Sequence, residues 1–318
     1  MSEIVVSAWQ YEHGIYAIDS GLMRQRMAAC YMIEDQNELA LVEAGTNHSV
    51  PIILKTLQMR GWRREQVRWV IVTHVHLDHA GGAGKLMEAL PEARLVVHPR
   101  GARHMIDPGK LEASARQVYG EEEFESHYGA LVPVSESRVE VAGDGHNLDL
   151  GARQFEFIDT PGHARHHFCV WDSASRGWFS GDTFGIAYKE LDTKNGPYIF
   201  PTTSPIQFDP VAHHLSIDRL AARDPSYVYP THFGRITYTT DLATKMHHGV
   251  DAYVAMAEEA VRHDHPKEQF ETAMRKWLMD GARAHGCRQT DKHLAAILDM
   301  DVMLNTAGLM HWMATRDK

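Results

Sequence analysis

The chain has 318 residues, with 32 lysines and arginines against 42 aspartates and glutamates, which gives a formal net charge of −10. An acidic chain lacks the attraction that nonspecific binders of nucleic acid or anionic membranes need, so we exclude both classes of partner. Apolar residues make up 44% and charged residues 23%, as in ordinary globular proteins. Disordered and collagen-like chains are therefore excluded, and the length suits one large domain with an appendage.

Cysteine usage indicates a reducing compartment. Cys30, Cys169 and Cys287 are widely spaced, odd in number and without a Cys-x-x-Cys pair, so the sequence predicts neither a disulfide framework nor a thiolate zinc site. The amino terminus shows no basic segment followed by an apolar one. No apolar run approaches the ~20 residues that cross a bilayer. We therefore expect a cytoplasmic protein.

Hydrophobic periodicity predicts an α/β fold up to about residue 238. Residues 69–72, Trp-Val-Ile-Val, are typical of a strand covered on both faces. A strand, helix, strand order follows, as in a parallel or mixed sheet packed by helices. The predicted strands are 15–18, 31–33, 39–42, 69–72, 94–97, 139–141, 148–150, 154–158, 168–171, 178–180 and 227–229. The predicted helices are 48–60, 80–90, pieces of 99–130 and one capped by Asp209 with Pro210 in its first turn.

After about residue 238 the strand signals cease, and the sequence predicts helices at 242–261, 267–284 and 291–313. We thus divide the chain into a domain of residues 1–238 and a helical region of residues 239–318, which is expected to cover a cleft or to form a dimer contact. Its methionines are interpreted as core filling, with a substrate-binding or dimerising surface as the alternative. Whether the protein forms a homodimer stays open.

Residues 73–82 read Thr-His-Val-His-Leu-Asp-His-Ala-Gly-Gly, which places three imidazoles and a carboxylate within six positions after an apolar strand. If the strand continues through His76, His74 and His76 share one face and can bind one ion, because strand side chains repeat every two residues. Asp78 and His79 come after the chain turns and can reach a second ion beside the first. The closing glycines allow a close backbone approach where the next helix starts.

Further candidate ligands directly follow three other apolar strands. His163 lies in Asp-Thr-Pro-Gly-His, Asp182 in Ser-Gly-Asp-Thr, and His232 in Tyr-Pro-Thr-His-Phe. Because α/β sheets bind ligands at the edge where strands end, these side chains are expected to converge there. Imidazole and carboxylate donors without thiolate suit zinc, iron, manganese or cobalt.

The His-x-His-x-Asp-His motif, followed in order by His163, Asp182 and His232, resembles the metallo-β-lactamase superfamily, and within it the branch of glyoxalase II and the lactonases. The resemblance covers about residues 10–238. It implies an αβ/βα sandwich with a dinuclear metal site at one edge. The ligands it implies are His74, His76 and His163 for the first ion, Asp78, His79 and His232 for the second, and Asp182 as a bridge between both.

The chemistry follows from this resemblance. Two divalent cations roughly 3.5–4 Å apart can share a water, lower its pKa and polarise a carbonyl, so no serine or cysteine nucleophile is assigned. Zinc is the expected metal, with iron or manganese as alternatives. Asp78 and Asp182 offset part of the positive charge and are the expected catalytic carboxylates. The predicted function is a hydrolase of an ester, thioester or lactone carbonyl in a small-molecule substrate.

Two other classes of function stay open. Oxygen-handling members of the superfamily hold two irons with the same ligands, and persulfide dioxygenases hold one, so a redox protein is one alternative. A regulatory protein that keeps the metal site and binds a ligand is the other. A β-lactamase is disfavoured because such enzymes are generally exported, and a nuclease is disfavoured by the charge of −10.

Residues near the motifs have secondary predicted roles. Glu43 stands where relatives often carry Asp-x-Gly, and it either orients ligands from behind or is a solvated carboxylate. The aromatic segment 186–208 is expected to line an apolar pocket, with a plain surface loop as the alternative. Arg235 and Tyr238 are candidate substrate contacts. Turn capping is assigned to Thr73, Thr160 and Thr231, a structural or ligand-supporting role to His167, and packed or surface positions to His166, His213, His214, His247 and His248.

Overall fold

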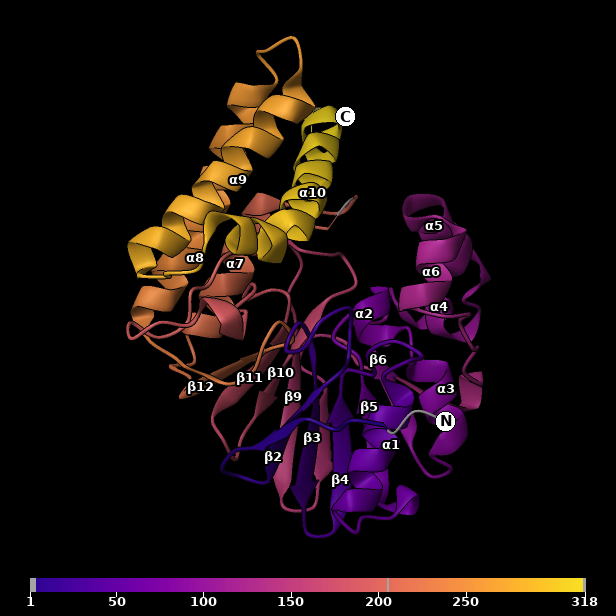
Figure 1. Cartoon of the computed structure of the whole chain (residues 1–318). Helices are drawn as coiled ribbons and strands as arrows, with labels where there is room; N and C mark the ends of the chain where they lie inside the picture. Colours follow the sequence, from indigo (N-terminus) through magenta and orange to yellow (C-terminus); the bar gives the residue numbers. More distant parts are fainter. Residues whose placement is uncertain (1–3, 205, 317–318) are drawn as a thin grey trace. The chain divides into compact units, whose positions relative to one another are not determined.

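The computed structural model describes residues 4–204 and 206–316 (Figure 1). Residues 1–3 of the predicted leaderless terminus, residue 205 of the predicted pocket segment and residues 317–318 of the predicted helical region lie outside them. The described residues divide into two compact units. The first runs up to Asp159 and adds His166–Gly181 and Ser226–Arg235; the second comprises Thr160–Arg165, Asp182–Pro225 and the chain from Ile236 onward. The domain boundary at residue 238 stays a prediction.

Within the described residues, the strands of the first unit form two mixed sheets. In the first sheet, β1 to β4 pair antiparallel and β4 to β7 pair parallel, in chain order. The second sheet is antiparallel from β8 to β11, and β12 joins it in parallel. The strands are β1 Ala8–Gln10, β2 Ile15–Asp19, β3 Ala29–Asp35, β4 Glu38–Val42, β5 Val67–Ile71, β6 Arg94–Val97, β7 Val139–Val141, β8 Asn147–Leu150, β9 Arg153–Asp159, β10 Phe168–Asp172, β11 Gly177–Gly181 and β12 Tyr227–Pro230.

Most residues of the central strand β4 are apolar, from Leu39 to Val42, because both of its faces are covered. On β4, Leu39 and Leu41 join a core that includes residues of the helices, whereas Ala40 and Val42 join a second core between the two sheets. The predicted α/β sandwich is therefore confirmed. The helices of this unit are α1 Val50–Met59, α2 Leu77–Ala80, α3 Ala83–Ala89, α4 Ala102–Ile106, α5 Gly109–Tyr119 and α6 Glu121–His127, with 3-10 turns η1 Arg64–Gln66 and η2 Glu136–Arg138.

The second unit is mainly helical, which confirms the predicted helical character of the carboxyl-terminal region. Figure 1 shows α8, α9 and α10 packed side by side in it. The Asp209 carboxylate accepts a hydrogen bond of 3.0 Å from Ala212 N–H, so the predicted cap of α7 is confirmed. The elements are η3 Lys189–Leu191, α7 Pro210–Ala221, β13 Ile236–Thr237, α8 Thr240–Ala260, α9 Pro266–His285 and α10 Asp291–Thr315.

The aromatic segment 186–208 is a packed part of the second unit. Tyr198 Oη donates to the Leu278 carbonyl of α9 at 3.0 Å, and Thr203 N–H donates to Asn305 Oδ1 of α10 at 2.8 Å. Its tyrosine and phenylalanine side chains are buried, so the alternative of a plain surface loop is wrong. That the segment lines a substrate pocket stays a prediction.

Among the helices of residues 4–204 and 206–316, none combines the length and apolar character that a bilayer crossing needs.

The core between the sheets gives a first prediction. Phe157 is fully buried there, with its ring centroid 4.9 Å from that of Phe168 in an edge-to-face contact. We expect Phe157→Ala to lower the free energy of unfolding by about 3–5 kcal/mol, because it leaves a cavity. Val118→Ala, at a site 63% exposed on α5, should change it by less than about 0.5 kcal/mol. Urea unfolding measures both, and equal effects would contradict this packing.

Candidate metal centre

The histidine motif begins after β5 has ended. β5 stops at Ile71, so the strand does not continue through His76, which was the condition for placing His74 and His76 on one strand face. Residues 72–76 follow β5 as a loop, and the single turn of α2, Leu77–Ala80, carries Asp78 and His79. The i, i+2 alternation of a strand is therefore not what brings the imidazoles together.

Gly82 fixes how α2 approaches the loop after β4. Its N–H donates to the Gly45 carbonyl at 2.8 Å, and Ala44 N–H donates to the His79 carbonyl at 2.8 Å. A Cβ at Gly82 would overlap the Thr46 and Ala44 carbonyl oxygens, so only glycine permits this approach. The predicted close backbone approach is confirmed at this residue.

Four imidazoles of the first unit form a continuous group. Ring centroids are 4.4 Å apart for His74 and His76, 4.0 Å for His74 and His79, and 5.5 Å for His79 and His232. His74 Nε2 lies 2.8 Å from His76 Nδ1. With Asp78, these residues are the five predicted ligands that belong to the first unit, and the fold brings them together.

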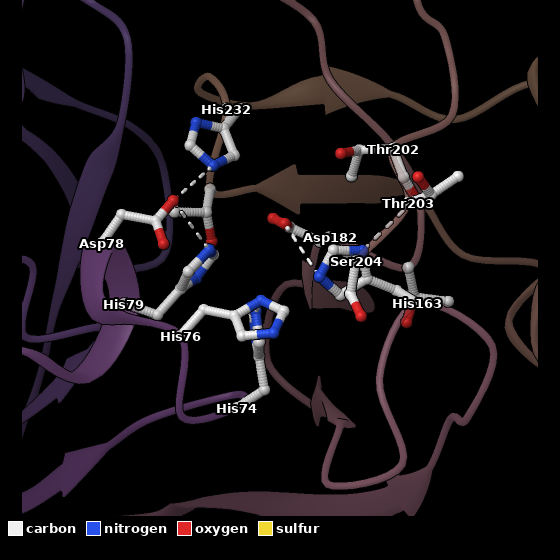
Figure 2. Close-up of polar contacts among 12 residues, drawn as sticks. His74, His76, Asp78, His79, His163, Asp182, Thr202, Thr203, Ser204 and His232 are labelled. Atoms are coloured by element: carbon white, nitrogen blue, oxygen red, sulfur yellow. Dashed lines mark hydrogen bonds and ion pairs between the residues drawn. The ribbon is translucent and has the colours of Figure 1, made fainter. Parts of the chain in front are cut away.

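Asp78 points at two of these imidazoles (Figure 2). Its Oδ2 atom lies 3.4 Å from His79 Nε2 and 3.2 Å from His232 Nε2. One donor atom from each of the three residues lies within 4.8 Å of the other two, a spacing that one cation can span. Burial alone would raise the pKa of the Asp78 carboxyl, but His79 and His232 hold that pKa well below its usual range. Asp78 is therefore an anionic candidate ligand.

The second nitrogen of each imidazole has its own acceptor. His79 Nδ1 lies 3.0 Å from the Glu43 carboxylate, and His232 Nδ1 lies 2.8 Å from the Met27 carbonyl. Because these oxygens accept, each Nδ1 carries a proton, and each Nε2 faces Asp78 across a gap in which a proton or a cation would lie. Histidines that bind metals are held in this manner. The donor set therefore fits a divalent ion.

Glu43 links three segments of the first unit. Its Oε1 accepts hydrogen bonds from the Thr73 hydroxyl at 2.6 Å, the Thr231 hydroxyl at 3.0 Å and His79 Nδ1–H. Since the Thr73 proton is used, the Thr73 oxygen accepts from His74 Nδ1 at 3.1 Å. Glu43 is fully buried, so the interpretation as an orienting residue is confirmed and the solvated alternative is wrong. Thr73 and Thr231 do more than cap turns, and Thr160 lies buried in the second unit.

His166 and His167 lie buried beside the predicted ligands. The ring centroids of His74 and His167 are 4.8 Å apart, and those of His76 and His166 are 5.5 Å apart. Val75 N–H donates to His166 Nδ1 at 3.5 Å. The packed position predicted for His166 is confirmed, but its place beside two ligands was missed. Its spacing of three residues from His163 was the only signal in the sequence.

The remaining two predicted ligands lie together in the second unit. His163 Nε2 is 3.4 Å from Asp182 Oδ2, and His163 Nδ1 donates to the Thr202 carbonyl at 3.3 Å (Figure 2). This pair repeats the arrangement of the first unit, with an imidazole whose Nδ1 faces a carbonyl and whose Nε2 faces a carboxylate. That both groups surround common ions stays a prediction.

Helix α7 connects the two loops that carry this pair. His213 Nε2 donates to the Thr183 carbonyl at 2.8 Å, and Ser216 Oγ donates to the Pro161 carbonyl at 2.6 Å. Gly162 has a φ of 133°, and a Cβ there would overlap the backbone of His213. The packed position predicted for His213 is confirmed; its role as a brace was missed, because nothing in its spacing marks it.

The predicted substrate contacts have other partners. The Arg235 guanidinium pairs with the Glu12 carboxylate and lies 4.5 Å from the Tyr227 ring centroid. The Tyr238 ring packs 6.1 Å from that of Phe184. Their contact with a substrate stays a prediction.

Comparison with known proteins identifies the family. The model of the metallo-β-lactamase superfamily matches residues 23–232. The chain belongs to the metallo-β-lactamase superfamily. A metallo-β-lactamase fold-containing protein of Sulfurisphaera tokodaii is 26% identical over 230 residues, 70% of this chain and 80% of the relative. The crystal structure of that archaeal superfamily protein matches with a TM-score of 0.66 at 21% identity, covering 93% of this chain and 98% of the other.

A second relative carries an activity in its name. The acyl-coenzyme A thioesterase MBLAC2 of Gallus gallus is 31% identical over 118 residues, which is 35% of this chain. The match spans only 40% of the thioesterase. This metallo-β-lactamase fold chain thus has a histidine and aspartate cluster suited to a divalent metal, and it belongs to a superfamily in which thioesterases occur.

The hydrogen bonds that Glu43 accepts give a second prediction. Glu43→Gln removes the charge that attracts the His79 N–H and replaces one acceptor oxygen by a donor. We expect metal affinity to fall by about 10–100-fold, because the far nitrogen of a ligand imidazole loses its partner. Competition with a chelator measures this. Glu65→Gln, at an exposed position, serves as the control, and an unchanged affinity in Glu43→Gln would contradict the role.

His213 gives a third prediction, on acid stability. Burial lowers the pKa of His213 from 6.5 to about 4. The unfolded chain therefore takes up a proton below about pH 6.5 that the folded chain refuses until about pH 4. The contribution of His213 to the free energy of unfolding is therefore complete above about pH 6.5. It falls by about 3 kcal/mol as the pH is lowered to about 4. Urea unfolding across this range, with chelator present, should show a smaller acid loss in His213→Gln; identical pH profiles would contradict it.

Proposed function

We propose that this protein is a dinuclear metal-dependent hydrolase of an ester, thioester or lactone carbonyl. The observation that carries the proposal is the donor set: imidazoles with acceptors on their Nδ1 atoms surround a carboxylate in the first unit, and a second such pair lies in the second unit. The proposed ligands are those that the superfamily resemblance implies: His74, His76 and His163 for one ion, Asp78, His79 and His232 for the other, and Asp182 for both.

When bound, such ions supply an activated water and polarise the carbonyl under attack. The chain's own residues offset the charge of the ions and hold the metal-binding side chains in a fixed orientation. Asp78 and Asp182 offset part of the positive charge of the ions. Glu43 and Met27 fix the protonated nitrogens of His79 and His232, so these rings need no reorientation to bind a cation. We assign no serine or cysteine nucleophile.

A thioester is the first substrate class to test. The relative named acyl-coenzyme A thioesterase supports it, since the same reaction class suits a carbonyl hydrolase. The aromatic segment 186–208 belongs to the unit that holds His163 and Asp182, and its contact with the acyl group is part of the proposal. A small-molecule substrate stays the expected partner.

The fourth prediction concerns the bridging carboxylate. We expect Asp182→Ala to lower hydrolysis by at least about 100-fold, more than the loss of an outer partner of a ligand costs, and to lower binding at both metal positions. Activity on a panel of thioesters, esters and lactones, together with metal content, measures this. Asp280→Ala, 64% exposed on α9, is the control. Full activity of Asp182→Ala on the panel would overturn the proposal.

A further inference from the structure

A second group of metal-binding side chains lies between α7 and α8, within the second unit. His214 and Asp218 are four residues apart on α7, and His247 and Asp251 are four residues apart on α8. Residues at this spacing lie on the same face of a helix. The two helices thus present matching histidine and aspartate pairs to each other.

The contacts run reciprocally between the helices. His247 Nε2 lies 3.1 Å from Asp218 Oδ1, and His214 Nε2 lies 3.1 Å from Asp251 Oδ1. The two Nδ1 atoms face each other at 2.7 Å, and the rings are close to parallel, at 12° with centroids 5.0 Å apart. Each histidine therefore binds the aspartate of the opposite helix through one nitrogen and faces the opposite histidine with the other.

This arrangement suits a cation. Because carboxylates only accept hydrogen bonds, each Nε2 carries a proton. In two neutral imidazoles, both Nδ1 atoms are then unprotonated, and their lone pairs point at each other. Such lone pairs repel unless a proton or a metal ion lies between them. A carboxylate on the far nitrogen is also the support that metal-binding histidines usually have.

We propose that His214 Nδ1 and His247 Nδ1 bind one divalent transition-metal ion of the Zn²⁺ class. Imidazole donors select zinc, nickel or copper over magnesium and calcium. Zinc–nitrogen distances of about 2.0–2.1 Å separate two tetrahedral ligands by about 3.3 Å, so the rings part by about 0.6 Å and turn until both lone pairs converge on the ion. The imidazoles are 29% and 28% exposed, which leaves room for water as the remaining ligands.

The ion would tie α7 to α8. His213, the next residue on α7, holds the Thr183 carbonyl beside Asp182. An ion at His214 therefore stiffens the helix that braces the loops of the His163 and Asp182 pair. The site shares no ligand with the proposed catalytic centre and does not depend on its activity.

Calorimetric titration of the metal-loaded enzyme with Zn²⁺ tests the site. The wild type is expected to bind one further ion per chain, with a rise in melting temperature. His214→Gln and His247→Gln each keep an amide near the Nε2 position for the aspartate but lose Nδ1, and are expected to weaken this binding at least tenfold. His248→Gln, at the neighbouring exposed position, is the matched control and should bind as the wild type does.

Three outcomes would overturn the site: no further ion in the wild type, the same loss in His248→Gln, or unchanged binding in both glutamine variants of the pair. A second measurement uses only the wild type, so it does not depend on how well the variants fold. Added Zn²⁺ should protect His214 and His247 from diethyl pyrocarbonate, as mapped by mass spectrometry. Modification of both residues at the same rate with and without Zn²⁺ would show a proton-sharing pair instead.

Discussion

The candidate metal centre of the first unit depends on one buried carboxylate. Glu43 accepts hydrogen bonds from the loop after β5, from α2 and from the loop after β12, through Thr73, His79 and Thr231. A buried charge is stable only when such donors surround it. Glu43 also has a φ of 69°, a conformation that costs energy for a residue other than glycine and persists where the surroundings enforce it. The strain and the hydrogen bonds together indicate a position under functional constraint.

In the second unit, His163 is also held in a fixed orientation, but by a different type of acceptor. There, backbone carbonyls replace the carboxylate: Thr202 receives the His163 N–H, while α7 holds the loops on both sides through His213 and Ser216. Both units therefore fix imidazoles by giving the far nitrogen an acceptor. Such preorganised rings bind a cation without losing much further freedom, which raises affinity.

Many of the strands and most of the candidate ligands could be predicted from the sequence, because both are marked by local sequence patterns. The apolar runs of β4 and β5 and the spacing of the histidine motif are visible in a few consecutive residues. β1 was missed because Ala-Trp-Gln has no apolar run, and the helix predicted at 80–90 is split, with α2 ending at Ala80 and α3 starting at Ala83. The orienting role of Glu43 was predicted from its place beside the motif that relatives carry, whereas the contact of the Met27 carbonyl with His232 was missed, because it depends on tertiary packing that single-sequence periodicity does not record.

The most direct test of the central claim, that seven side chains hold two ions, is a crystal structure of the metal-loaded protein with anomalous data at the absorption edge of its metal. Two neighbouring peaks should appear: one contacting His74, His76 and His163, the other Asp78, His79 and His232, with Asp182 between them. A structure in which these side chains point apart, or in which a fully loaded protein carries its ions elsewhere, would contradict the account.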